Sequence, residues 1–128
     1  MLTNSAVYPT LPTTDLKRSK DFYTNKLGLQ VDHESANGIL YKAGADTKLY
    51  VYQRPPSTAE HTLASFDVED IEKTIDELTE KGISFEHYDF PGLKTNDKGI
   101  ADSEEEGGRG AWFKDPDGNI LAIFQRTK

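Results

Sequence analysis

Apolar residues recur with helical spacing in two segments of the chain. Each segment opens with an aspartate, Asp15 or Asp70, whose side chain can accept hydrogen bonds from the free N–H groups of a first helical turn. Each closes with a lysine and a nearby glycine, a composition typical of helix C-termini. The pattern predicts two helices, with apolar stripes formed by Leu16, Ser19, Phe22, Tyr23 and Leu27 and by Ile71, Thr74, Ile75 and Leu78.

Short runs rich in apolar and β-branched residues surround both helices and predict strands. One strand precedes each helix, at residues 7–12 and 62–68. Three strands follow each helix, at residues 29–34, 39–42 and 48–53 and at residues 84–88, 110–114 and 119–126. The order β-α-β-β-β therefore occurs twice, and we expect a single domain, residues 1–128, with internal modules 7–54 and 61–126.

The final hairpins of the two modules have matching lengths. Tyr41 corresponds to Phe113 and Gln53 to Gln125, an offset of 72 residues in both cases. The segment 115–119 reads Asp-Pro-Asp-Gly-Asn, which predicts a tight turn between the last two strands. Residues 54–58 form a proline-rich linker, and residues 90–108 form a long insertion of the kind that is usually functional or mobile, with an exposed charge run at 102–106.

Composition excludes several classes of function. The 128 residues include no cysteine, so disulfides and thiolate chemistry are ruled out. The net charge of −7 argues against nucleic acid as a partner. The mean hydropathy is −0.68, and the longest apolar run, 120–124, is far shorter than the ~20 residues of a membrane span. Because the first five residues also lack the features of a signal peptide, we expect a cytoplasmic protein with no membrane partner.

The first helix and the last turn carry a recognisable combination of residues. The helix contains Asp15-Leu16, Ser19, Phe22-Tyr23 and Leu27-Gly28, and the turn reads Asp-Pro-Asp-Gly-Asn. Joined to the tandem β-α-β-β-β order, this combination resembles the glyoxalase/bleomycin-resistance/extradiol-dioxygenase (vicinal oxygen chelate, VOC) superfamily. The segments 11–12, 88–95 and 111–115 are similar to an uncharacterised branch of small bacterial proteins within it.

The resemblance implies an α+β fold in which the strands of the two modules curl into a mixed sheet that forms a cup. It also implies a homodimer, because members of the family often complete their cups across a subunit interface. Typical enzymes of the family hold a divalent metal ion in the cup through His, Glu or Gln side chains.

The resemblance places the four metal-ligand positions at Tyr8, Tyr50, Leu63 and Ala122. Leucine and alanine have no lone pairs to donate, and neutral phenols, with a pKa of ~10, are poor ligands at pH 7. His33, His61 and His87 have no helical or hairpin spacing that would join them in another metal site. We therefore expect neither a metal nor any other cofactor.

We expect the cup to bind a small, partly apolar or aromatic organic molecule. Strand alternation places aromatic and small apolar side chains on its inner face, together with hydroxyl groups and one imidazole. The expected ligand-binding residues are Tyr8, Thr10, Tyr50, Tyr52, His61, Leu63, Trp112, Ala122 and Phe124. Ordinary sheet packing is the rival interpretation for the tyrosines and Trp112, and a surface position is the rival for His61.

Two further functions remain open on the sequence alone. One is a VOC enzyme, such as a glyoxalase-like lyase or isomerase or a dioxygenase. It would use His61 as a catalytic general base with a tyrosine hydroxyl, or a metal ion held by residues other than those named above. The other is a narrower binding function, the sequestration of an antibiotic or toxin, for which the negative net charge favours a cationic compound.

Overall fold

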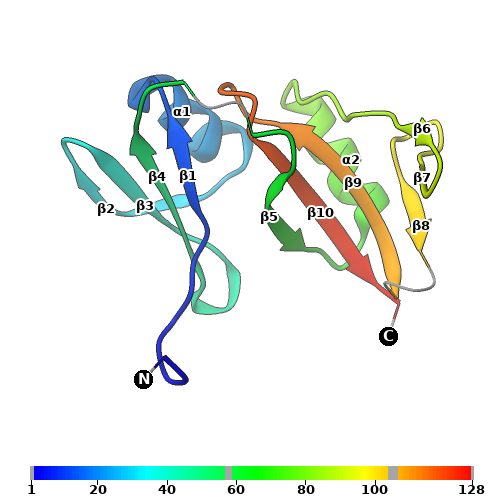
Figure 1. Cartoon of the computed structure of the whole chain (residues 1–128), viewed down its shortest axis with the longest axis horizontal. Helices are drawn as coiled ribbons and strands as arrows, with labels where there is room; N and C mark the ends of the chain where they lie inside the picture. Colours follow the sequence, from blue (N-terminus) through cyan, green and yellow to red (C-terminus); the bar gives the residue numbers. More distant parts are fainter. Residues whose placement is uncertain (1, 57–58, 104–106, 128) are drawn as a thin grey trace. The chain divides into compact units, whose positions relative to one another are not determined.

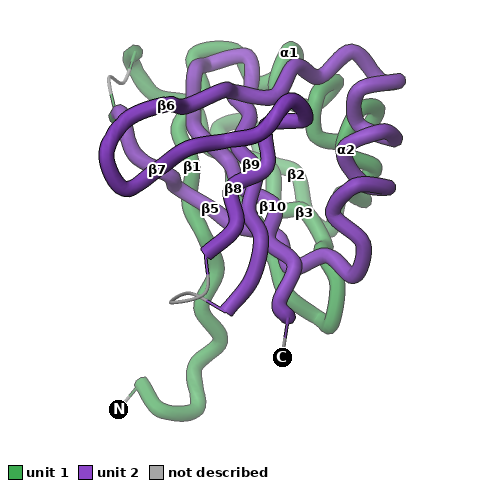
Figure 2. The backbone as a smooth tube through the Cα atoms, turned by 90° about the vertical axis from the view of Figure 1, so that its right-hand side faces the viewer, with its two compact units in different colours: residues 1–59 green, residues 60–128 purple. Residues whose placement is uncertain are grey.

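The computed structural model describes residues 2–56, 59–103 and 107–127. These residues belong to two compact units, residues 1–59 and 60–128, each of which contains one of the predicted modules (Figure 2). Residues 57 and 58 of the predicted linker lie outside the described residues, as do residues 104–106 of the predicted charge run.

The first unit is a four-stranded sheet with a helix packed on one face. Its strand order is β1-β4-β3-β2, with β1 parallel to β4 and the other neighbours antiparallel (Figure 1). Its elements are β1 (Thr10–Thr13), α1 (Leu16–Asp21), a π-helical turn (Phe22–Lys26), β2 (Gln30–Ser35), β3 (Gly38–Lys42), a 3₁₀ turn (Gly44–Asp46) and β4 (Lys48–Gln53).

The second unit repeats this topology. Its larger sheet has the order β5-β10-β9-β8, with β5 parallel to β10, and a separate two-stranded hairpin joins β6 to β7 (Figure 1). Its elements are β5 (Thr62–Asp67), α2 (Ile71–Glu80), β6 (Asp89–Phe90), β7 (Leu93–Lys94), β8 (Ala101–Ser103), β9 (Gly108–Lys114) and β10 (Ile120–Arg126).

Both helices begin where the sequence predicts. The carboxylate of Asp15 accepts a hydrogen bond from the Arg18 N–H at 3.1 Å, and that of Asp70 accepts one from the Lys73 N–H at 3.1 Å. The predicted apolar stripes supply the buried residues Ser19, Phe22 and Tyr23 in the first unit and Ile71 and Ile75 in the second. The first helix departs from α geometry only in its last part, where the N–H of Leu27 bonds the carbonyl of Phe22, five residues earlier.

The predicted match between the two final hairpins is confirmed. Leu40 pairs with Tyr50 across β3 and β4, and Trp112 pairs with Ala122 across β9 and β10, which is an offset of 72 at both positions. The turn of the second hairpin is held by Asp115, which is 5% exposed. Its carboxylate accepts hydrogen bonds from the N–H of Asp117 and from both the N–H and the side-chain amide of Asn119, at 2.8–2.9 Å.

Two predicted strands are wrong in extent or place. The first strand starts at Thr10 rather than at residue 7, because its pairing with β4 begins at Tyr50, and Val7 before it is 89% exposed. The predicted strand 84–88 is reduced to one bridge between Phe85 and Phe113. The edge of β9 is instead taken by β8, which lies inside the predicted insertion 90–108 and pairs Ala101 with Gly110.

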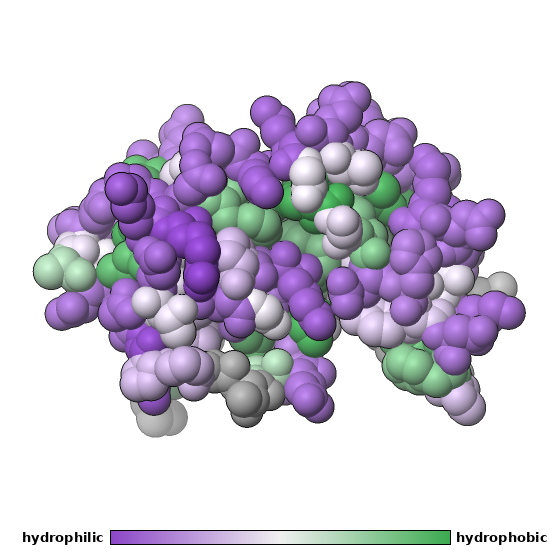
Figure 3. All heavy atoms as spheres, turned by 90° about the horizontal axis from the view of Figure 1, so that it is seen from above, coloured by the Kyte–Doolittle hydropathy of each residue, from purple (hydrophilic) through white to green (hydrophobic). Residues whose placement is uncertain are grey.

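The surface agrees with the charged composition of the chain. The face seen from above is mostly hydrophilic, with scattered hydrophobic side chains (Figure 3). Among the described residues, no helix is both long enough and apolar enough to cross a membrane.

Candidate functional site

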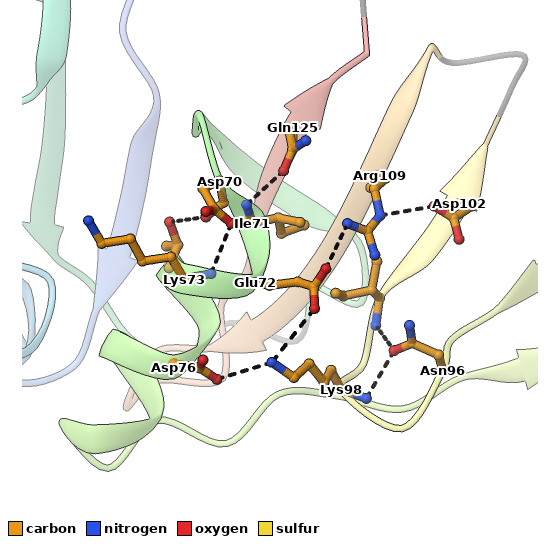
Figure 4. Close-up of polar contacts among 12 residues, drawn as sticks. Asp70, Ile71, Glu72, Lys73, Asp76, Asn96, Lys98, Asp102, Arg109 and Gln125 are labelled. Atoms are coloured by element: carbon orange, nitrogen blue, oxygen red, sulfur yellow. Dashed lines mark hydrogen bonds and ion pairs between the residues drawn. The ribbon is translucent and has the colours of Figure 1, made fainter.

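Helix α2 covers one face of the second sheet and leaves the other face open. On the covered side, the Ile71 N–H donates to the side-chain amide oxygen of Gln125 at 2.8 Å, and Glu72 pairs with Arg109 at 3.3 Å (Figure 4). Because side chains alternate between the faces of a sheet, the neighbours of Arg109 and Gln125 point away from α2. The open face therefore carries Gly108, Gly110 and Trp112 of β9 and Ala122, Phe124 and Arg126 of β10.

A pocket of about 340 Å³ lies on this open face. Its volume is at the lower end of the range of ~300–1,000 Å³ that is usual for small-molecule sites. The apolar part of its lining consists of Trp112, Ala122, Ile123 and Phe124, with Gly110 between the two aromatic rings. The lining therefore offers two flat aromatic surfaces and a small side chain to an organic ligand.

Two glycines of β9 allow the rings to lie against the sheet. A Cβ atom at Gly110 would stand 3.4 Å from the Trp112 ring and 3.5 Å from the Phe124 ring. A Cβ atom at Gly108 would overlap the Phe124 ring, at 2.7 Å from Cζ. Because neither glycine has a side chain, Phe124 can occupy the space directly above the backbone, and the pocket stays open beside it.

The polar part of the pocket lining is formed by two hydroxyls and an ion pair. Thr62 and Ser65 come from β5, and both are exposed. Asp67 at the end of β5 lies 3.7 Å from the Nε of Arg126, and the guanidinium of Arg126 stands 5.9 Å from the centre of the Phe124 ring. Both partners of the ion pair are mostly exposed, so a ligand can displace it at little cost.

A β-bulge at the start of β5 changes which residues reach the pocket. Ile120 pairs with Thr62, but the next residue, Leu121, pairs with Ala64, so Leu63 is left without a partner in the ladder. The regular alternation from which His61 and Leu63 are expected at the ligand site is therefore interrupted at this bulge. Leu63 is half-buried and His61 is exposed, and neither lines the pocket.

The open face of the first unit is also aromatic. Tyr50 and Tyr52 of β4 are stacked, with ring centres 6.1 Å apart and planes 4° from parallel. Thr10 pairs with Tyr50 in the neighbouring strand, and Tyr8 precedes that strand with 44% of its surface exposed. The structure thus brings Thr10, Tyr50 and Tyr52 onto one sheet, and Trp112, Ala122 and Phe124 onto another.

Trp112 is also in contact with a tyrosine from outside the sheet. The ring of Tyr88 meets the ring of Trp112 edge to face, with the ring centres 5.7 Å apart. Burial raises the pKa of the Tyr88 hydroxyl, and the negative charge of Glu86 adds to this effect. Tyr88 is therefore neutral at physiological pH and can serve as a hydrogen-bond donor beside the pocket.

Several residues of the pocket lining are absent from the predicted set. They are Thr62, Ser65, Asp67, Gly110, Ile123 and Arg126. Alternation along the strands gives a signal for two of them, since Gly110 lies two residues before Trp112 and Arg126 lies two residues after Phe124. Thr62 could not be found in this way, because the bulge that turns it toward the pocket has no signal in the local sequence.

The residues present do not fit the divalent metal ion that typical members of the resembled family hold. Ala122 provides no donor atom, and Asp67 is the one carboxylate in the pocket lining, where it is already paired with Arg126. No group of three His, Cys, Asp or Glu side chains comes together within residues 2–56, 59–103 and 107–127. The ring of His87 lies instead against a backbone carbonyl, with its Nε2 3.1 Å from the oxygen of Asp97.

Comparison with known proteins agrees with this fold. An uncharacterised protein of Bacillus subtilis (strain 168), YraH, is 29% identical over 131 residues, which cover 90% of this chain and 93% of YraH. Among solved structures, TnmS3, an antibiotic binding protein from Streptomyces sp. CB03234, has a TM-score of 0.66 and 24% identity, with 98% of each chain covered. The bleomycin resistance determinant encoded on the transposon Tn5 has a TM-score of 0.70 and 21% identity, and covers 98% of this chain and 100% of its own.

At these identities the structural likenesses concern the fold. The family assignment comes from the sequence, because residues 5–123 match one family model. This range includes both helices and both final hairpins, apart from the last three residues of β10. The chain belongs to the Glyoxalase/Bleomycin resistance protein/Dioxygenase superfamily.

Proposed function

We propose that this protein binds a small, partly apolar or aromatic organic molecule in the pocket of the second unit, without a metal ion. The observation that carries the proposal is the lining of the pocket, where Trp112 and Phe124 flank the small residues Gly110 and Ala122. A flat ligand can lie between the two rings, and the hydroxyls of Thr62 and Ser65 can accept or donate hydrogen bonds at its edge.

The chemistry of the lining supports binding without a metal. Hydroxyl groups and one ion-paired carboxylate are too few and too weak as donors for a divalent transition metal, which prefers imidazole, thiolate or several carboxylates. Ala122 stands where the resemblance to the family places a glutamate ligand. An alanine at this position removes the donor and leaves space that an organic ligand can fill.

The known binding properties of similar proteins support a small organic molecule as the ligand. TnmS3 is an antibiotic binding protein, and the Tn5 protein is a determinant of bleomycin resistance. Both have the fold of this chain. Sequestration of an antibiotic or toxin is the narrower form of the proposed function, with the ligand's aromatic part placed against Trp112 and Phe124.

A homodimer is the expected assembly. Each four-stranded sheet has two edge strands, β1 and β2 in the first unit and β5 and β8 in the second, and natural proteins usually cover such edges. Light scattering on the purified protein should give twice the mass of 14.3 kDa, and a monomer at micromolar concentration would contradict the expectation.

The pocket contains its own reporter, because Trp112 is the single tryptophan of the chain. N-phenyl-1-naphthylamine, a neutral aromatic probe, should bind with one site per chain and accept excitation energy from Trp112. The substitution Ala122→Phe should abolish this binding by filling the pocket. Ala36→Phe, the same substitution in the exposed turn between β2 and β3, should leave it unchanged.

The same titration tests the role of a metal. Affinity for the probe should be equal after treatment with a chelator and after addition of Zn²⁺, Mn²⁺ or Ni²⁺. The proposal fails if the probe binds equally well to the Ala122→Phe variant, or if chelation removes a stoichiometric metal together with the binding.

A further inference from the structure

The hairpin β6–β7 lies beside the pocket and is joined to it by a chain of aromatic contacts. The ring of Tyr88, just before β6, meets the Trp112 ring with centres 5.7 Å apart. The ring of Phe90, within β6, meets the Tyr88 ring with centres 5.8 Å apart. The apolar surface of the pocket therefore continues from Trp112 across Tyr88 to Phe90.

The hairpin extends to the side of the sheet that bears the pocket. Figure 2 shows β6 and β7 displaced from the sheet in the direction away from α2. Since the pocket also lies on the face that α2 leaves open, the hairpin and the pocket are on the same side. Phe90 is 53% exposed, which is unusual for a large apolar side chain in a chain so rich in charge.

The hairpin is held in a defined position next to Trp112. The Glu86 N–H donates to the carbonyl of Trp112 at 2.8 Å, which fixes the start of the segment to β9. At the base of the hairpin, Tyr88 and Thr95 exchange backbone and hydroxyl hydrogen bonds at 2.9–3.3 Å. The hairpin is therefore a fixed part of the second unit.

A tight turn fixes the tip of the hairpin. Phe90 pairs with Leu93, and the two residues between them are Pro91 and Gly92, with Gly92 at φ +88°. Proline restricts its own φ and glycine adopts this positive φ without strain, as a type II turn requires. Phe90 is consequently presented to solvent in a preorganised way, which lowers the entropy cost of binding a ligand against it.

We infer that the β6–β7 hairpin is the outer wall of the binding site, and that Phe90 and Tyr88 select an elongated aromatic ligand that reaches from Ala122 past Trp112. The inference rests on the proposed function, because it extends the same site. A compact ligand with one ring would fill the pocket alone, whereas a ligand with two or more linked rings would also contact the hairpin.

Two probes of different length distinguish the contribution of the hairpin to binding from that of the pocket. N-phenyl-1-naphthylamine is the long probe, followed by its fluorescence, and 4-fluorophenol is the compact probe, followed by ¹⁹F line broadening. Phe90→Ala should weaken binding of the long probe about fivefold to tenfold, the contribution usual for one aromatic contact, and leave the compact probe unchanged. Lys94→Ala, on the opposite strand of the hairpin, is the matched control and should change neither affinity.

The possible outcomes distinguish a failure of the proposed function from a failure of the inference about the hairpin. If both probes bind the wild type and Ala122→Phe blocks them, but Phe90→Ala changes neither, the hairpin is not part of the site and the proposed function stands. If neither probe binds the wild type, the proposed function fails and the inference fails with it. An equal loss of both probes in Phe90→Ala, with a lower unfolding midpoint, would also overturn the inference, because it would assign Phe90 to stability.

Discussion

Two glycines of β9 provide a sharp test of the pocket geometry. Gly108 and Gly110 lie on the same face of the same strand, and neither has a positive φ, so an alanine can adopt the backbone conformation at both positions. Their surroundings differ. A Cβ atom at Gly110 would make ordinary contacts of 3.4–3.6 Å with two rings, whereas one at Gly108 would collide with the backbone carbonyl of Gln125 and with the Phe124 ring.

The expected effects on stability therefore have opposite signs. Gly110→Ala should raise the free energy of unfolding by about 0.4–1 kcal/mol, because alanine restricts the unfolded chain and buries a methyl group without strain. Gly108→Ala should lower it by about 1–3 kcal/mol, since a backbone oxygen cannot rotate away as a flexible side chain can. The two variants should thus differ by roughly 1.4–4 kcal/mol.

Urea unfolding followed by circular dichroism and by Trp112 fluorescence measures this difference. A change of 1 kcal/mol corresponds to about 4 °C in melting temperature for a chain of this size, so thermal unfolding provides a second measure. Equal stability of the two variants, or a more stable Gly108→Ala, would refute the packing of Phe124 over Gly108.

The same two variants also separate the effect of a substitution on stability from its effect on ligand binding. Gly110 belongs to the pocket lining, so its new methyl group would enter the space between the Trp112 and Phe124 rings. Gly110→Ala should therefore bind N-phenyl-1-naphthylamine more weakly while it unfolds at a higher urea concentration. Tighter binding by this variant would mean that the probe does not occupy the pocket.

Other parts of the structure give three further expectations. Burial, with a smaller effect of a nearby carboxylate, raises the pKa of Tyr41 to about 12. The contribution of Tyr41 to the free energy of unfolding should therefore be constant below pH 10 and fall as the pH rises toward 12, and Tyr41→Phe should lose this part of the pH dependence. Because the substitution removes a buried hydroxyl without a hydrogen-bond partner, it should also raise the free energy of unfolding by about 1 kcal/mol in urea titrations at pH 8. Asp115→Ala should cost about 2–4 kcal/mol in the same titrations, because it removes three hydrogen bonds from a buried turn. Asp70→Ala should cost about 1 kcal/mol through loss of the helix cap, with Glu69→Ala, at the exposed neighbouring position, close to the wild type.

The architecture was accessible from the sequence because its signals are local and repeated. The capping aspartates, the apolar stripes and the Asp-Pro-Asp-Gly-Asn turn are each determined by a few neighbouring residues, and the offset of 72 relates the second module to the first. The strand predicted at 84–88 was wrong for a non-local reason. Its alternating pattern is suitable for a strand, but the edge of β9 pairs with β8, which the sequence does not reveal.

The site was accessible only in part, for a related reason. Trp112, Ala122 and Phe124 lie in regular strands, where alternation is reliable, and all three line the pocket. The place of Thr62 depends on a bulge, and the place of Tyr88 depends on a hairpin within a long insertion. Both features are fixed by contacts with distant residues rather than by local spacing.

Two paired positions differ in size between the repeats, because Leu40 and Tyr50 of the first unit correspond to Trp112 and Ala122 of the second. The pattern aromatic-Gln-Arg ends β4 and β10 alike, and each arginine stands over its aromatic ring, at 6.0 Å for Arg54 and 5.9 Å for Arg126. The corresponding positions before these motifs carry Tyr50 in one repeat and Ala122 in the other.

In the first unit, the ring of Tyr50 stacks on Tyr52 and places its hydroxyl over Gly38. In the second unit, Gly110 corresponds to Gly38, and the side chains nearest to it are the Trp112 and Phe124 rings, while Ala122 presents only a methyl group to the pocket. The second unit thus has the larger side chain at one of the two paired positions and the smaller one at the other, and both of its residues line the pocket. Under the proposed function, Ala122 offers no donor atom to a metal ion and leaves room beside Trp112 for part of an organic ligand.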